Sequence, residues 1–227
     1  MGRRGCVKTT ADEVFKLLRA AYPDARCELD FTSPFQLLVA TVLSAQSTDV
    51  GVNKVTPVLF ARWPTPQALA EADRAELEEV IRPTGFFRNK AAALQGLSRQ
   101  ITDDYDGKVP VSIDDLVKLP GVGRKTANVV RGHAFGLPAI TTDTHVLRVS
   151  KRLGWTTSAK PEVVETDLQQ LFDPSDWTVL SDTLIFHGRR RCHAKKPACG
   201  ACVVGGLCPS YGTGPTDPDE AKALVKS

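Results

Sequence analysis

Four cysteines near the C-terminal end have the type and spacing of metal ligands. Cys192, Cys199, Cys202 and Cys208 fall within 17 residues, whereas a secreted disulfide scaffold spreads its cysteines along the chain. Zinc and a [4Fe–4S] cluster both accept four thiolates. The spacing alone leaves both open, although a zinc ribbon more often has two close pairs. The sequence therefore predicts a four-thiolate metal centre.

A second group of residues suits phosphate binding. In the stretch Leu119–Ala127, Gly121 and Gly123 permit a tight turn. Their amides, followed at once by a helix N-terminus, form a concavity for phosphate, and Arg124 and Arg131 add planar donors. We expect this hairpin to position DNA without reading its sequence. A Pro-Gly-x-Gly turn that only separates two helices is the alternative.

Lys125 is the candidate for amine chemistry. It lies in the first turn of the helix after the hairpin, where the helix dipole disfavours a charged amine. An uncharged lysine can attack a carbon and form a Schiff base, but a plain phosphate contact remains open. Eighteen residues on, Asp143 can cap the next helix. If it faces Lys125, it can instead accept a proton or stabilise positive charge on a sugar carbon.

The apolar residues have helical spacing throughout the chain. They repeat at i, i+3, i+4 and i+7 in residues 14–21, and Ser33 before Pro34 predicts another helix start. Because no convincing strand pattern occurs, we expect an all-α fold. Pro57 should kink or split the helix expected over residues 48–62.

Composition and charge limit the functional classes. The 227 residues are 42% hydrophobic with a net charge of +3, which disfavours disorder. No segment approaches the roughly 20 apolar residues of a membrane span, so we expect an intracellular protein. Residues 121–152 hold six basic residues and one acid, and residues 186–196 hold five basic residues and no acid. This segregation indicates a face for a polyanion, with solvated helix surfaces as the alternative.

Together these residues resemble the endonuclease III family of DNA glycosylases. The likeness rests on Leu43–Val50, Leu119–Ala127, Thr142–His145 and the cysteine loop 192–208, in the same order over about residues 10–210. It implies two helical lobes with DNA bound in the cleft between them. One lobe is a six-helix barrel with a helix-hairpin-helix motif, and the other carries a [4Fe–4S] cluster.

The resemblance also implies domain boundaries. The barrel is expected at residues 28–138, and the cluster domain combines residues 1–27 with residues 139–212. Residues 213–227 are expected to be a flexible tail, because the sequence from residue 212 turns to Gly, Pro, Thr and Asp.

The activity implied is removal of oxidised pyrimidines from duplex DNA with cleavage of the abasic site. The family places Lys125 as the nucleophile on the sugar C1′, Asp143 as its partner, and β-elimination as the strand-cutting step. The damaged nucleotide is flipped out of the stack, and Gln46 and Phe86 enter the gap. The family often has an aliphatic residue at the latter position, so Phe86, followed by Phe87, is a departure. Core packing is the alternative for both phenylalanines.

The likeness makes the four cysteines ligands of a [4Fe–4S] cluster. The further residues expected to contact DNA are Gly121, Gly123, Arg124, Arg131, Arg189, Arg190, Arg191 and Lys195. We expect a monomer that acts on double-stranded DNA containing damaged bases or abasic sites, located in the cytoplasm at the nucleoid. Cys6 and Cys27 are interpreted as plain thiols.

Three alternative functions remain at this point. A monofunctional glycosylase of the same superfamily uses water and lacks a lysine at the position of Lys125. A non-catalytic helix-hairpin-helix protein would bind DNA without forming a product. An iron–sulfur redox sensor would need an exposed resolving cysteine, which the sequence does not offer.

Overall fold

The computed structural model describes the backbone of residues 2–226 and the side chains of residues 10–226, so the side chain of Cys6 lies outside the described residues. The chain forms two compact units, residues 27–137 and residues 1–26 with 138–227. Every regular element in the described chain is a helix, which confirms the expected all-α fold. No helix of the described chain is both long and apolar enough to cross a membrane.

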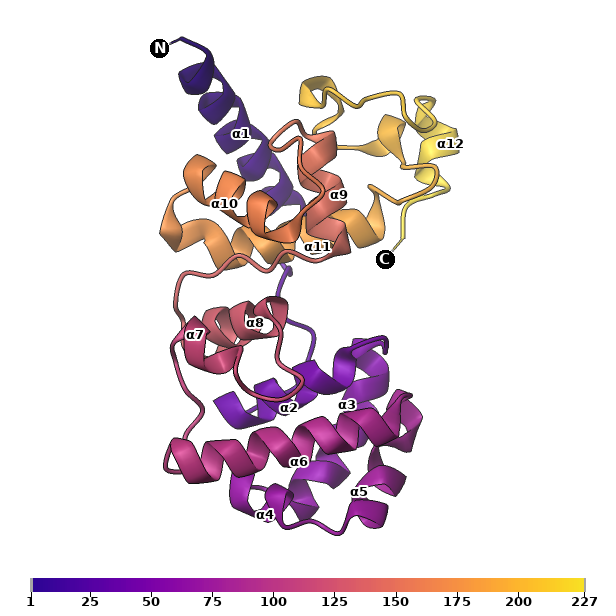
Figure 1. Ribbon diagram of the computed structural model, residues 1–227. Helices are drawn as coiled ribbons and strands as arrows, with labels where there is room; N and C mark the ends of the chain where they lie inside the picture. The colour runs from indigo at the N-terminus through magenta and orange to yellow at the C-terminus, as the bar shows by residue number, and fades with distance from the viewer. Residues whose placement is uncertain (1, 227) are drawn as a thin grey trace. The chain divides into compact units, whose positions relative to one another are not determined.

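The unit of residues 27–137 is built around a buried helix. Its elements are α2 (Pro34–Ser44), α3 (Asp49–Arg62), α4 (Pro66–Ala70), α5 (Arg74–Ile81), the short 3-10 turn η1 (Arg82–Thr84), α6 (Phe87–Asp104), α7 (Ile113–Leu116) and α8 (Arg124–Ala134). Ser33 caps α2 by accepting a hydrogen bond from the Gln36 amide, with Pro34 as the first helical residue. The residues from Leu37 to Leu43 are buried, and α2 packs against α3, α6 and α8 (Figure 1). This apolar helix fixes the positions of the helices around it.

Helix α3 is not split at Pro57. Of the two outcomes expected for this proline, a kink or a split, the split is excluded, because α3 runs as one helix from Asp49 to Arg62. Val55 and Leu59, on either side of Pro57, are both buried in the core. Their burial offsets the backbone hydrogen bond that proline removes, so the helix is not split.

The second unit has its own core. Its elements are α1 (Gly2–Ala21), α9 (Thr144–Arg152), α10 (Pro161–Leu171), η2 (Pro174–Asp176), α11 (Trp177–Arg190), η3 (Cys199–Ala201), η4 (Gly205–Leu207) and α12 (Pro218–Lys222). Helix α11 packs against both α1 and α9 (Figure 1). Leu18 of α1, Val149 of α9 and Leu184 of α11 are fully buried in the shared core. The N-terminal helix and the C-terminal half of the chain thus form one body.

The C-terminal segment is not the flexible tail that we expected from the sequence. Asp217 caps α12 by accepting hydrogen bonds from the amides of Asp219 and Glu220, and Ala221 is fully buried. The Lys226 amide donates to the Arg190 carbonyl at 2.9 Å. An Asp-Pro pair is a helix-start signal, and the prediction missed it because the surrounding residues are rich in Gly and Pro.

Candidate active site and cluster loop

The hairpin between α7 and α8 needs glycine at one position and leaves another open. Gly121 has φ +78°, and a Cβ there would lie 2.7 Å from the Ala93 Cβ on α6, so both backbone and packing exclude a side chain. Gly123, the N-cap of α8, has φ −92°, and a Cβ there would meet no atom within 4 Å. Buried Leu119 and Val122 hold the turn against the core. Gly123 is therefore free of internal constraint and exposes backbone to solvent.

Lys125 follows this turn directly. It is the second residue of α8 and is exposed, as is Arg124. Ala127 and Val130 of the same helix are fully buried, which fixes the helix so that the lysine faces solvent. Arg131 is only partly exposed, and its Nε is buried without a hydrogen-bond partner among the described atoms. Arg124 is therefore better placed than Arg131 to meet a ligand beside Lys125.

Asp143 belongs to the other unit and caps α9. Its Oδ1 accepts hydrogen bonds from the amides of His145 and Val146, both at 2.8 Å. The capping role given above as an alternative is thus present. It does not exclude a second role, because a carboxylate has two oxygens and both of these bonds use Oδ1.

His145 is held within its own unit rather than in an open site. Its Nδ1 lies 3.1 Å from an Arg148 guanidinium nitrogen, and a Cβ on Gly188 would lie only 2.8 Å from Nδ1, so α11 approaches α9 closely here. Burial lowers the pKa of His145, and the positive charge of Arg148 acts in the same direction, while Asp143 opposes it. Its surroundings therefore favour the neutral ring.

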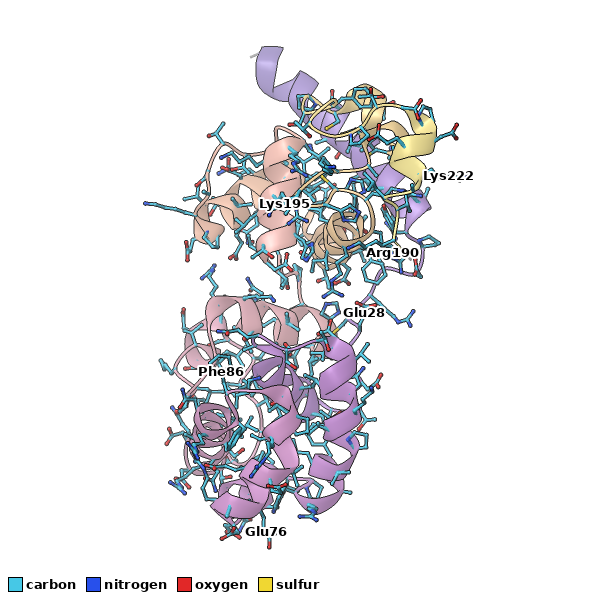
Figure 2. The ribbon with its side chains drawn as sticks, turned by 90° about the vertical axis from the view of Figure 1, so that its right-hand side faces the viewer. Glu28, Glu76, Phe86, Arg190, Lys195 and Lys222 are labelled. Atoms are coloured by element: carbon cyan, nitrogen blue, oxygen red, sulfur yellow. The ribbon has the colours of Figure 1, made fainter. Side chains whose placement is uncertain are left out.

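Gln46 and Phe86 share an unusual backbone conformation. Both are exposed non-glycine residues with positive φ, +56° and +46°, a conformation that stores strain and concentrates at functional sites. Phe86 is 63% exposed, which is uncommon for a large apolar side chain (Figure 2). Phe87 is partly buried against the core, with the guanidinium groups of Arg82 and Arg88 over its ring. The core-packing alternative therefore holds for Phe87 and not for Phe86.

The four cysteines line a single pocket in the second unit. Cys192, Cys199, Cys202 and Cys208 are free thiols on its wall, and apolar residues including Val149 close it. Four thiols that line one pocket are a ligand set that a [4Fe–4S] cluster accepts.

Donors aimed at the sulfur atoms fit an anionic group in this pocket. An Arg152 guanidinium nitrogen lies 3.3 Å from the Cys192 Sγ, and the His187 Nε2 lies 3.9 Å from the Cys202 Sγ. Burial raises the pKa of the Cys202 thiol to about 11, so metal binding must displace its proton. The donor set and its charge therefore fit a four-thiolate iron–sulfur cluster.

The sequence analysis did not identify these supporting side chains. Arg148 and Arg152 lie one helical turn apart on α9, and both donate to carbonyls of the cysteine loop, at Cys192 and His193. Their spacing of four residues with like charge on one helix face was the available signal. His187 is almost fully buried, and nothing in the sequence distinguished it from an exposed histidine.

The basic residues just before and within the cysteine loop divide into two groups. Arg189 and Lys195 are exposed, as Figure 2 shows for Lys195. Arg190 instead forms a bidentate pair with Asp24 and stacks over the Phe186 ring at 4.5 Å. Arg191 donates to the Tyr22 hydroxyl at 3.1 Å. Arg190 and Arg191 therefore fix the position of residues 22–24, which follow α1, in addition to being positively charged groups that a ligand could contact.

Comparison with known proteins gives consistent matches. Residues 39–174 match the family described as HhH-GPD superfamily base excision DNA repair protein. Residues 192–208 match the iron–sulfur binding domain of endonuclease III, and these residues begin and end at the first and last cysteine of the loop.

Proteins that are similar to this chain over most of its length are also named endonuclease III. The chain is 53% identical over 204 residues to endonuclease III of Synechocystis sp., covering 89% of this chain and 93% of that relative. It is 49% identical to endonuclease III of Bacillus subtilis over 82% of this chain and 86% of the relative. A solved endonuclease III–DNA covalent intermediate superposes with a TM-score of 0.85 at 45% identity, covering 90% of this chain and 96% of the other.

Proposed function

Because the chain belongs to the endonuclease III family of base-excision DNA repair proteins, we propose that Lys125 is its nucleophile and Asp143 the partner of that lysine. The enzyme is a bifunctional DNA glycosylase and AP lyase. The observation that carries the assignment is the exposed Lys125 in the first turn of α8, directly after a hairpin whose Gly123 leaves the backbone open to a ligand. We propose oxidised pyrimidines in duplex DNA as the substrates.

The proposed chemistry follows from an amine and a carboxylate. The Nζ of Lys125 attacks the sugar C1′ and gives up a proton, the bond from C1′ to the base breaks, and the base leaves with the bonding electrons. The C1′–O4′ bond then opens, O4′ takes up a proton, and C1′ and Nζ form an iminium. The iminium makes the C2′ proton acidic, and loss of that proton expels the 3′ phosphate by β-elimination. Asp143 accepts a proton or stabilises the positive charge that develops at the sugar.

Borohydride trapping tests this assignment. Reduction of the iminium on DNA with an abasic site should give a covalent adduct with the wild-type enzyme and none with Lys125→Ala. Asp143→Asn should lose turnover and keep DNA affinity. An undiminished adduct from Lys125→Ala, or the absence of an adduct from wild type, would defeat the assignment and favour a monofunctional glycosylase or a non-catalytic DNA-binding protein.

The chain also binds a [4Fe–4S] cluster. We propose Cys192, Cys199, Cys202 and Cys208 as its ligands, since these four thiols line one pocket. When bound, the cluster supplies a structural cross-link for the loop and no step of base removal. Purified protein should be yellow-brown with about four irons per chain, and colourless protein with stoichiometric zinc would contradict this.

DNA binding is proposed to use both units. Gln46 and Phe86 enter the space left by the flipped nucleotide, and the amides of Gly121 and Gly123 hold backbone phosphate. The proposed basic phosphate contacts are Arg124, Arg131, Arg189, Arg190, Arg191 and Lys195. Among them the exposed side chains of Arg124, Arg189 and Lys195 are the best placed. We also propose that the enzyme acts as a monomer on DNA of the nucleoid in the cytoplasm, and light scattering of the pure protein tests the first part.

A further inference from the structure

Lys90 is a buried lysine on α6 that the proposed chemistry does not use. Its exposed fraction is 6%, and its Nζ donates to the carbonyls of Leu43 and Thr84 at 2.8 and 2.7 Å. Burial lowers the pKa of Lys90. Lysine is almost never buried without partners, so a buried lysine with two carbonyl acceptors points to a specific role.

The two acceptors lie at the ends of two different helical elements. Leu43 is in the last turn of α2, and Thr84 is the last residue of η1. Carbonyls at helix ends lack intrahelical partners and carry partial negative charge, which suits an ammonium group. One Lys90 side chain therefore ties together the ends of two elements that are about forty residues apart in sequence.

The chain that follows each acceptor leads directly to a strained and exposed residue. Gln46 comes three residues after Leu43, and Phe86 comes two residues after Thr84. These are two of the four non-glycine residues with positive φ in the described chain. Such conformations persist only where the surroundings fix them, and Lys90 contacts the fixed carbonyl just before each one.

We propose that Lys90 is a positioning residue that holds the loops 44–47 and 85–86 at a set separation, so that Gln46 and Phe86 enter the DNA as a pair. This inference rests on the proposed roles of those two residues in the gap left by the flipped nucleotide. Lys90 itself touches no DNA in this account. It acts through the two carbonyls.

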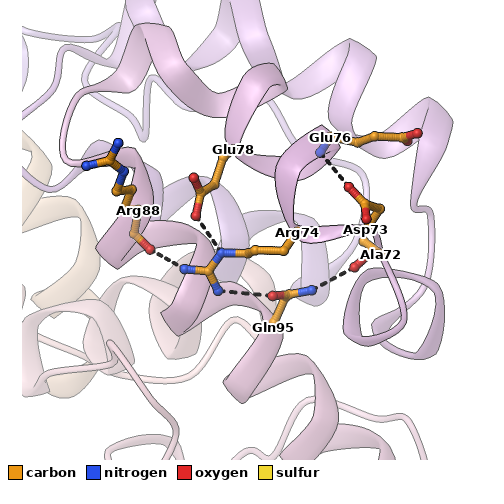
Figure 3. Close-up of polar contacts among 7 residues, drawn as sticks. All are labelled: Ala72, Asp73, Arg74, Glu76, Glu78, Arg88 and Gln95. Carbon is orange, nitrogen blue, oxygen red and sulfur yellow. Dashed lines mark hydrogen bonds and ion pairs between the residues drawn. The ribbon is translucent and has the colours of Figure 1, made fainter.

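A neighbouring side chain provides a matched control. Arg74 of α5 anchors the same end of α6: it pairs with Glu78 at 2.7 Å, donates to the Gln95 side chain at 3.0 Å, and donates to the Arg88 carbonyl (Figure 3). These contacts fix α6 but reach neither loop carbonyl. Arg74→Met should therefore lower stability without disturbing Gln46 and Phe86.

The experiment measures the entry of Gln46 and Phe86 into the DNA separately from catalysis. A duplex with a tetrahydrofuran abasic analogue opposite 2-aminopurine cannot be cleaved, and its fluorescence at saturating protein reports how the opposite base is unstacked. Lys90→Met should bind this duplex and give less than half of the wild-type fluorescence change. Excision of an oxidised pyrimidine from duplex DNA should fall about tenfold to a hundredfold, as expected for a small misplacement.

Three comparisons test whether Lys90 positions Gln46 and Phe86. Arg74→Met should keep the fluorescence change and excision within about twofold of wild type. Phe86→Ala should cost much less activity in the Lys90→Met background than in wild type. Both changes remove the same event, the correct entry of Phe86 into the DNA, so their effects should not add. Lys90→Arg, which keeps donors in place, should recover part of the signal. Lys90→Gln, whose side chain is shorter, replaces Lys90→Met if that variant does not fold.

Two results would overturn the inference. One is a wild-type fluorescence change in folded Lys90→Met. The other is equal loss in Lys90→Met and Arg74→Met at equal loss of melting temperature, which would make Lys90 a residue of the fold alone. Failure of the proposed function is distinguishable, because it shows in borohydride trapping with wild type and Lys125→Ala, and neither protein carries a change at Lys90.

Discussion

The hairpin of residues 117–123 and the cysteine loop of residues 191–213 are both irregular segments that present groups to a ligand, but they are held in different ways. In the hairpin, buried Leu119 and Val122 and the close approach of Gly121 to Ala93 fix the backbone. The cysteine loop contains only the three-residue turns η3 and η4. Its carbonyls accept hydrogen bonds from Arg148 and Arg152, Val204 is buried, and its four thiols line one pocket.

Because of this difference, removal of iron should loosen the cysteine loop and leave the hairpin unchanged. A segment held by core packing needs only the polypeptide, because the apolar area that it buries is its own. A segment held by thiolates needs iron, because metal binding contributes directly to the free energy of folding. The two-unit architecture keeps these dependences in separate bodies.

Removal of the cluster should have the largest effect. Cys202→Ser, or oxidative loss of iron, should lower the melting temperature of the second unit by about 10 °C or more, as a loss of about 3 kcal/mol or more implies for a chain of this size. Hydrogen exchange should show lost protection in residues 191–213 and in α12. Protection of α8 should be unchanged.

The internal control is Cys27, a half-buried thiol of the other unit. Cys27→Ser should keep the full iron content and colour. Equal loss of protection in the hairpin and in the cysteine loop after iron removal would contradict the separation of the two bodies.

Substitutions at two glycines of the hairpin should separate its role in stability from its role in DNA binding. Gly121→Ala should destabilise by about 2–4 kcal/mol, from the left-handed backbone and the clash with Ala93. Gly123→Ala meets no atom and should change stability by no more than about 0.5 kcal/mol. It should nevertheless weaken DNA binding by about tenfold, since its methyl group keeps a phosphate from the backbone amides.

Denaturant unfolding and fluorescence anisotropy with an abasic-site duplex measure these two quantities for both variants. If Gly123→Ala bound DNA as tightly as wild type, the open space at this position would have no role in phosphate binding. If Gly121→Ala were as stable as wild type, the packing argument for the hairpin would be wrong.

Comparison of sequence and structure shows which signals are local. The spacing of apolar residues, the capping Ser33 and the spacing of the cysteines are short patterns. The first two predicted the all-α fold from the sequence alone, and the third predicted a metal centre. Lys90 and His187 could not be found this way, because their importance comes from partners 47 and 165 residues away, Leu43 and Tyr22. The α12 helix was missed because the glycines and prolines before it outweighed its Asp-Pro start.

The basic residues next to the cysteine loop should differ in their effect on salt dependence. Arg189→Ala and Lys195→Ala should each reduce the slope of log affinity against log salt concentration by about one, as expected for loss of one phosphate contact. Arg190→Ala should change the slope less, because its guanidinium is already paired with Asp24. Equal reductions in all three variants would show that the Asp24 pair opens when DNA binds.

The smallest effect should come from that pair itself and should depend on pH. The hydrogen bond from Arg190 holds the pKa of Asp24 below its usual value of 3.8. The folded state therefore binds its proton less readily than the unfolded state. The stabilising contribution is present above pH 4 and is lost as the pH falls through the lowered pKa.

Because this carboxylate is at the surface, the loss should be small beside that of Gly121→Ala. The difference in melting temperature between wild type and Asp24→Asn should shrink as the pH is lowered from 6 to 3, and added salt should shrink it at pH 6. These measurements are made with the cluster intact. If the difference in melting temperature is constant across this pH range, the Arg190–Asp24 pair does not stabilise the turn after α1. The stacking of Arg190 on Phe186 would then fix the position of Arg190.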